Sequence, residues 1–173
     1  KACYNKTINS NPTFVEKHWN LQNSSGPDFI IIGAQKSGTT SLENYICQHP
    51  QVLPAVKKEI HFWYRDFEKG IDWYLAHFPP IPKSLNYLTG EATPNYLENW
   101  ASAARIKEAF PKIKLLLIVR NPIDRAFSQY NHWIRLRWEN RSFEEAIKSE
   151  IEMLEKNPDN PVGYALIPED FKF

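Results

Sequence analysis

The chain has 173 residues, 42% of them hydrophobic and 24% charged, which are ordinary values for one globular domain with a buried core. Its formal net charge of +1 excludes the strongly basic surface of a nucleic-acid-binding protein, so no nucleic-acid partner is expected. No apolar run approaches the roughly 20 residues that cross a bilayer. The two cysteines, Cys3 and Cys47, exclude a disulfide framework and a cysteine-based metal site.

The beginning of the chain differs in composition from the rest. Residues 1–26 are polar and rich in asparagine, without a periodic hydrophobic pattern. We interpret them as an N-terminal arm that precedes one domain over residues 27–173. The arm carries no hydrophobic signal region and cysteine is scarce, which together favour a cytoplasmic protein.

The first regular elements predict a strand, a polar loop and a helix. Residues 29–32 form an apolar run typical of a buried parallel strand, and a helix is expected over residues 39–49. Such a turn directs backbone N–H groups and the positive end of a helix at one point, which suits a phosphate-like anion. A Walker A loop has its lysine directly after the second glycine, but here Thr39 follows Gly38 and the lysine is Lys36. The sequence therefore predicts a phosphate loop of another kind.

Strands and helices continue to alternate along the chain. Residues 57–63 are expected to form a short strand or an ordered loop. The other predicted elements are strands at residues 51–55, 87–91 and 114–119, and helices at residues 70–78, 102–110, 123–138 and 142–155. The strand at 114–119 has the clearest pattern of a buried strand after the first one. This alternation predicts an α/β fold with a parallel sheet flanked by helices.

The predicted loop holds several groups that could bind an anion. Gly33 and Gly38 would let the backbone approach a ligand, Lys36 would supply a positive charge, and Thr39 and Thr40 would add hydroxyl donors. The simpler interpretation is that Gly33 ends a strand and Thr39 caps a helix. Two glycines, a lysine and several hydroxyls together favour the anion site.

Three other positions are candidates for chemistry. Glu59 and His61 lie on one face if their segment is extended and could form a tuned general base, although a solvated edge is the alternative. Arg120 closes a predicted strand and Ser128 follows about two turns into the next helix, an arrangement that suits a second phosphate. Glu91 ends another strand, and it either supports the site or faces a polar network in the core.

Four segments together resemble the sulfotransferase family. In chain order they are residues 32–42, 58–62, 90–96 and 118–128. Residues 69–74 are in addition similar to the N-sulfotransferase domain of the heparan sulfate enzymes. The resemblance is thus to the heparan-sulfate-type branch and its bacterial relatives.

This resemblance implies 3′-phosphoadenosine 5′-phosphosulfate (PAPS) as the sulfuryl donor and no metal. The loop residues that would hold the 5′-phosphosulfate are Lys36, Ser37, Gly38, Thr39 and Thr40. Arg120 and Ser128 would hold the 3′-phosphate. Glu59 falls on the position of the catalytic base, His61 on a neighbouring active-site position, and Lys36 would stabilise the charge of the departing phosphate. Ala92 stands where the heparan sulfate enzymes commonly carry a lysine.

The implied acceptor is a hydroxyl or amine of a glycan or a similar small compound. After Pro161 the chain has no counterpart of the second half of the family's domain, so we expect its N-terminal part, truncated at the C-terminus. Golgi relatives keep their membrane anchor upstream of the catalytic domain, which makes a Golgi lumen the alternative to the cytoplasm. The alternative functions are a P-loop-type nucleotide kinase or NTPase, and an inactive truncated nucleotide-binding module.

Overall fold

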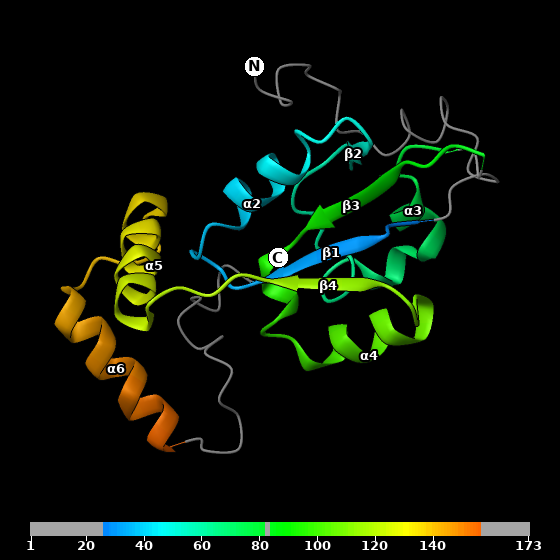
Figure 1. Ribbon diagram of the computed structural model, residues 1–173. Helices are drawn as coiled ribbons and strands as arrows, with labels where there is room; N and C mark the ends of the chain where they lie inside the picture. The colour runs from blue at the N-terminus through cyan, green and yellow to red at the C-terminus, as the bar shows by residue number, and fades with distance from the viewer. Residues whose placement is uncertain (1–25, 82–83, 157–173) are drawn as a thin grey trace. The chain divides into compact units, whose positions relative to one another are not determined.

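The computed structural model describes residues 26–81 and 84–156 and divides the chain into two compact units at residue 120 (Figure 1). The first unit contains the sheet, and the second contains two helices. The predicted arm, apart from Gly26, and the residues after Pro161 lie outside the described part of the chain. The domain limits therefore stay a prediction.

A four-stranded parallel sheet forms the centre of the first unit. Its strands, in chain order, are β1 (Phe29–Gly33), β2 (Val52–Pro54), β3 (Leu88–Ala92) and β4 (Lys114–Leu117). They lie in the order β2-β3-β1-β4, and every neighbouring pair is parallel. Because β1 and β3 are central, their side chains are covered on both faces, as the continuous apolar run of β1 predicts. The predicted α/β fold with a parallel sheet is confirmed.

Helices cover both faces of this sheet (Figure 1). Helix α2 (Thr39–Ile46) packs Leu42 and Ile46 on the face that contains Phe29 and Ile31. The opposite face, with Ile30, is covered by α3 (Ile71–Leu75) and α4 (Trp100–Ala109), whose buried side chains join an aromatic core. Alternate residues of β1 thus enter different cores, as strand geometry requires.

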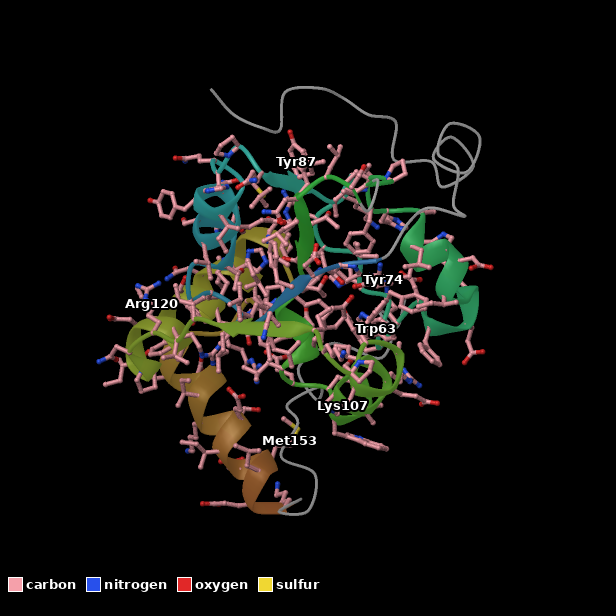
Figure 2. The ribbon with its side chains drawn as sticks, turned by 45° about the vertical axis from the view of Figure 1, so that its right-hand side comes forward. Trp63, Tyr74, Tyr87, Lys107, Arg120 and Met153 are labelled. Carbon is pink, nitrogen blue, oxygen red and sulfur yellow. The ribbon has the colours of Figure 1, made fainter. Side chains whose placement is uncertain are left out.

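The aromatic core sits between the sheet and α3. Trp63 and Tyr74 are almost fully buried there, with ring centroids 4.9 Å apart, and Figure 2 shows both on the side of the sheet where α3 lies. Phe62 stacks on Tyr74 with a centroid distance of 4.8 Å. These rings fix the loop that precedes them in the chain, residues 57–61, against the end of the sheet.

One expectation about local structure is corrected, and one pair of alternatives is decided. The strand at 114–119 is shorter than predicted and is not buried, since Leu115 is 49% and Leu117 51% exposed. The physical reason is its place at the edge: among the described residues β4 pairs with β1 alone. Of the two alternatives predicted for residues 57–63, the structure shows the ordered loop, in which His61 adopts a left-handed backbone conformation with φ 61°.

The second unit consists of α5 (Pro122–Leu136) and α6 (Phe143–Lys156). Asn121 caps α5, accepting a hydrogen bond from the N–H of Ile123 at 3.0 Å. A capping box begins α6: the Glu145 carboxylate accepts from the Ser142 N–H at 2.8 Å, and the Ser142 hydroxyl accepts from the Glu145 N–H at 3.3 Å. Both helices begin where the sequence predicted, because their start signals are local.

Candidate active site

The phosphate loop connects the carboxyl end of β1 to the start of α2. Its backbone is tied to the neighbouring strand at one end, where Ala34 N–H donates to the carbonyl of Ile118 at 2.8 Å, and it turns through Lys36 in a left-handed conformation with φ 64°. The first intrahelical bond runs from Leu42 N–H to Gly38. The N–H groups at 39–41 therefore have no partner within the helix. The helix start also lacks a side-chain cap from this chain, which leaves it suited to an anion.

The two glycines of the loop have different roles. A Cβ at Gly33 would lie 2.9 Å from the Leu97 side chain, so this glycine allows close packing inside the protein and not the approach of a ligand. Gly38 has φ +102° and open space around it, with Ile118 Cδ1 3.9 Å away as the nearest atom. The expected close approach of backbone to ligand thus applies to Gly38, where only glycine adopts the required conformation easily.

The side chains of the loop lie at different depths. Thr39 is buried, Lys36 is half-buried, and Thr40 and Gly38 are exposed. The Ser37 hydroxyl oxygen is buried and has no hydrogen-bond partner among the described residues. A buried hydroxyl without a partner costs free energy unless a ligand or water satisfies it. This feature points to a polar ligand in the loop.

Glu59 and His61 come together although their segment is not extended. Glu59 Oε2 lies 3.6 Å from His61 Nε2, and the Tyr64 hydroxyl lies 2.9 Å from His61 Nδ1. The left-handed turn at His61 brings its ring back toward the glutamate, as alternation along a strand would not. The predicted pairing is correct, but the predicted geometry behind it is not.

The charges around Glu59 link it to the phosphate loop. Burial raises the pKa of Glu59, while the positive charges of Lys58 and Lys36 lower it. The charge of Lys36 is thus close enough to influence Glu59, although 23 positions separate the two residues in the sequence. A half-buried carboxylate with a raised pKa, held beside a cation, has the properties of a general base.

His61 is uncharged at neutral pH. Burial lowers its pKa to about 4, and the positive charges of Arg65 and Lys57 act in the same direction. A neutral imidazole can accept a hydrogen bond from Tyr64 at Nδ1 while its Nε2–H faces Glu59. In this arrangement His61 lies beside the carboxylate and does not neutralise its charge.

A buried ion pair joins the segment of Glu59 to helix α2. Lys58 Nζ lies 3.1 Å from Glu43 Oε2, and the two side chains are only 12% and 6% exposed. Burial raises the pKa of Glu43, against the opposing effect of Lys58. The sequence analysis did not identify this pair. Its signal was an acidic residue on the otherwise apolar side of the helix at 39–46.

Glu91 lies in a polar network of the core, which is one of the two predicted interpretations. Its carboxylate is fully buried and accepts hydrogen bonds from the hydroxyls of Tyr74 (2.8 Å), Tyr96 (3.0 Å) and Thr93 (2.6 Å). Burial raises its pKa to about 7, although these hydrogen bonds lower it. Thr93 was not among the residues predicted from the sequence. The one signal was the Glu91 carboxylate within a buried strand, because such a carboxylate needs hydrogen-bond donors around it.

Arg120 and Ser128 belong to the second unit. Arg120 is exposed just before α5, and Ser128 is half-buried within that helix. Their predicted contact with a 3′-phosphate stays a prediction. Within residues 26–81 and 84–156, no group of three or more His, Cys, Asp or Glu side chains is placed to hold a metal ion. In the same part of the chain, no helix has the length and apolar character to cross a membrane.

Comparison with known proteins identifies the family. The family model described as "Sulfotransferase domain" matches residues 26–164 of the chain. The chain belongs to the sulfotransferase family. A sulfotransferase from Alicyclobacillus acidocaldarius has a similar structure, with a TM-score of 0.60 and 31% identity over 83% of this chain and 64% of the solved one.

Curated sulfotransferases are similar in sequence over part of their length. The membrane-associated sulfotransferase kil1 of Dictyostelium discoideum is 39% identical over 75% of this chain and 29% of the relative. The human bifunctional heparan sulfate N-deacetylase/N-sulfotransferase 3 is 35% identical over 61% of this chain and 13% of the relative. This sulfotransferase chain thus spans less than a third of these two relatives.

Proposed function

We propose that the chain carries the donor site and the catalytic base of an enzyme that transfers a sulfuryl group from PAPS to a hydroxyl or amine of a carbohydrate-like acceptor. Membership of the sulfotransferase family supports the reaction type. The names of two relatives, a heparan sulfate N-sulfotransferase and a heparan sulfate glucosamine 3-O-sulfotransferase, support a carbohydrate acceptor. They also leave both amine and hydroxyl acceptors open.

The observation that carries this proposal is the electrostatic pairing of Glu59 with Lys36. It links a carboxylate of raised pKa to the cation of a phosphate loop. Sulfuryl transfer needs these two groups on opposite sides of one reacting centre, a base for the acceptor proton and a positive charge for the leaving phosphate. A nucleotide-binding module without turnover would not need the base.

The residues of the loop fit a phosphosulfate donor. The unpartnered Ser37 hydroxyl, the uncapped start of α2 and Lys36 supply neutral, backbone and charged donors, respectively. When bound, the donor supplies an activated sulfuryl group attached to a phosphate leaving group. We propose that Lys36, Ser37, Gly38, Thr39 and Thr40 bind its 5′ end and that Arg120 and Ser128 bind its 3′-phosphate.

The protein residues then act on one proton and one charge. Glu59 removes the proton of the acceptor hydroxyl or amine as the acceptor attacks. His61, neutral and held by Tyr64, keeps the Glu59 carboxylate oriented. Lys36 and the N–H groups at the start of α2 stabilise the negative charge that develops on the leaving phosphate.

The compartment is a separate proposal. The relative from Dictyostelium discoideum is named as membrane-associated, which supports the alternative of a membrane anchor upstream of the catalytic domain. A cytoplasmic location is the other alternative. Fractionation of cells that express the full-length gene product distinguishes the two.

A transfer assay with Glu59→Gln tests the proposed base. We expect the substitution to reduce sulfuryl transfer from labelled PAPS by at least about 100-fold, with little change in the affinity for adenosine 3′,5′-bisphosphate. Glu68→Gln, an exposed glutamate in the short 3-10 helix Phe67–Lys69, is the matched control and should retain activity. Full activity of Glu59→Gln would remove this residue from the base role.

A binding comparison tests the donor and the kinase alternative. We expect the protein to bind adenosine 3′,5′-bisphosphate more tightly than ATP, and the substitution Arg120→Ala to reduce this preference. Titration calorimetry with both nucleotides measures the two affinities. Equal or tighter binding of ATP would contradict the sulfotransferase proposal and favour a nucleotide kinase or NTPase.

A further inference from the structure

The hydroxyl of Thr93 connects the buried Glu91 to the segment that carries Glu59 and His61. Thr93 Oγ1 donates to Glu91 Oε2 at 2.6 Å. The same oxygen accepts from the backbone N–H of Ile60 at 3.1 Å and of His61 at 3.5 Å. One side chain thus holds the backbone directly after Glu59.

The direction of these hydrogen bonds is fixed by the two backbone amides, which can only donate. A hydroxyl has one proton to donate and two lone pairs to accept with. Glu91 takes the proton, so both lone pairs of Thr93 remain for the amides at 60 and 61. The other carboxylate oxygen is held by Tyr74 and Tyr96, and both Glu91 and Thr93 are fully buried. The Thr93 hydroxyl therefore has one orientation in which its proton and both of its lone pairs are hydrogen-bonded.

The backbone of Thr93 is bound to the strand that leads into the phosphate loop. Its N–H donates to the carbonyl of Ile31 at 3.1 Å, two residues before Gly33. Thr93 therefore bonds β1 through its backbone and the segment at 60–61 through its side chain. This is a hydrogen-bonded connection between the strand that leads into the loop and the segment of Glu59.

We propose that Thr93 is a positioning residue, which sets the placement of Glu59 and His61 relative to the phosphate loop. The proposal rests on the proposed function, because it takes Glu59 as the base and the loop as the donor site. A displacement of about 1 Å between reacting groups can lower a rate on the order of 100-fold. Loss of this connection should therefore affect turnover more than donor binding.

The isosteric pair Thr93→Val and Thr93→Ser tests this proposal. The valine variant lacks the hydroxyl, and the serine variant keeps it. We expect Thr93→Val to lower kcat on the order of 100-fold while KM for PAPS changes less than about threefold. Thr93→Ser should restore kcat to within about threefold of the wild type.

Tyr74→Phe is the matched control for a purely structural role. It removes a buried hydrogen bond to the same carboxylate but leaves both bonds from Thr93 to the segment at 60–61. We expect it to lower stability to urea, as Thr93→Val does, and to keep kcat near the wild-type value. Equal losses of kcat in the two variants, or no rescue by serine, would overturn the positioning role.

Amide hydrogen exchange gives a second readout that does not depend on activity. We expect faster exchange at the N–H of Ile60 and His61 in Thr93→Val, and wild-type protection in Thr93→Ser and Tyr74→Phe. Unchanged protection in the valine variant contradicts the proposal whatever the rates show. If wild-type protein transfers no sulfuryl group while exchange behaves as expected, the proposed function fails and the structural connection stands.

Discussion

At the scale of single residues, burial decides which side chains near Glu59 carry charge. It lowers the pKa of His61 to about 4, with Arg65 and Lys57 adding to the effect, and it raises the pKa of Glu59. His61 is therefore neutral. The pKa of Glu59 is shifted toward the pH at which a general base is most effective. This division of roles favours Glu59, and not His61, as the group that removes a proton.

The pKa of His61 is a direct test of this environment. NMR titration of its ring should give a midpoint near 4, well below the ordinary value of 6.5. Arg65→Gln should raise the midpoint, because it removes a nearby positive charge. A midpoint near 6.5 in the wild type would contradict the buried environment described for this ring.

The pH dependence of stability tests the environment of Glu91. Its pKa rises from 4.5 to about 7 on folding, chiefly through burial, so the folded state holds the proton more tightly. Its contribution to stability is complete below pH 4.5 and is lost as the pH rises through about 7. Between pH 5 and pH 8, wild type should therefore lose stability relative to Glu91→Gln. Urea unfolding of both proteins measures this difference, and a difference that does not change with pH rules out the raised pKa.

At the scale of elements, the loop at 57–61 is held by contacts to two different elements. The Lys58–Glu43 ion pair joins it to α2, and Thr93 at the end of β3 binds its backbone. Both contacts come from elements next to the phosphate loop. An irregular loop can therefore hold the proposed base, Glu59, in a fixed place, because its neighbours are regular and well packed.

Breaking the ion pair should destabilise the protein. Lys58→Met leaves the buried Glu43 carboxylate without its cation, at an expected cost of about 3 kcal/mol in the free energy of unfolding. The double variant Glu43→Leu/Lys58→Met should regain most of this loss, because no unpaired charge remains. Urea unfolding measures the free energy of unfolding of the single and the double variant. Lys112→Met, at an exposed position, is the control. A double variant as unstable as the single one would show that packing, and not the unpaired charge, is responsible.

At the scale of the molecule, β4 leaves an apolar edge exposed. Leu115, Leu117 and Val119 are 49%, 51% and 73% exposed, and among the described residues β1 is the one strand that pairs with β4. Exposed apolar edge strands promote pairing with other chains. The exposed leucines thus identify β4 as a candidate surface for self-association.

The double substitution Leu115→Lys/Leu117→Lys tests this edge. We expect it to shift the protein toward monomer in sedimentation velocity, because lysine at an edge strand opposes pairing. The free energy of unfolding should change by less than about 1 kcal/mol, since exposed positions contribute little. An unchanged distribution of species in a protein that self-associates would exclude β4 as the contact.

The sequence alone determined the family and most of the regular elements. The phosphate loop, with Lys36 within it, and the parallel sheet follow from local patterns: an apolar run, a glycine-bounded loop and a helix start are neighbours in the chain. The capping box of α6 was likewise predictable, because Ser142 and Glu145 lie one turn apart. Such signals need no knowledge of the rest of the fold.

The tertiary structure alone decided how the site is assembled. Burial of β4 was overestimated, because its apolar sequence does not tell whether another element covers it. The links from Lys36 to Glu59 and from Glu91 through Thr93 to His61 join residues that are 23 and 30 positions apart. Distance between such groups depends on the packing of β1, β3 and the loop at 57–61, and so does the pKa of each buried side chain. The sequence thus named the candidate site residues, and packing set their geometry and charge.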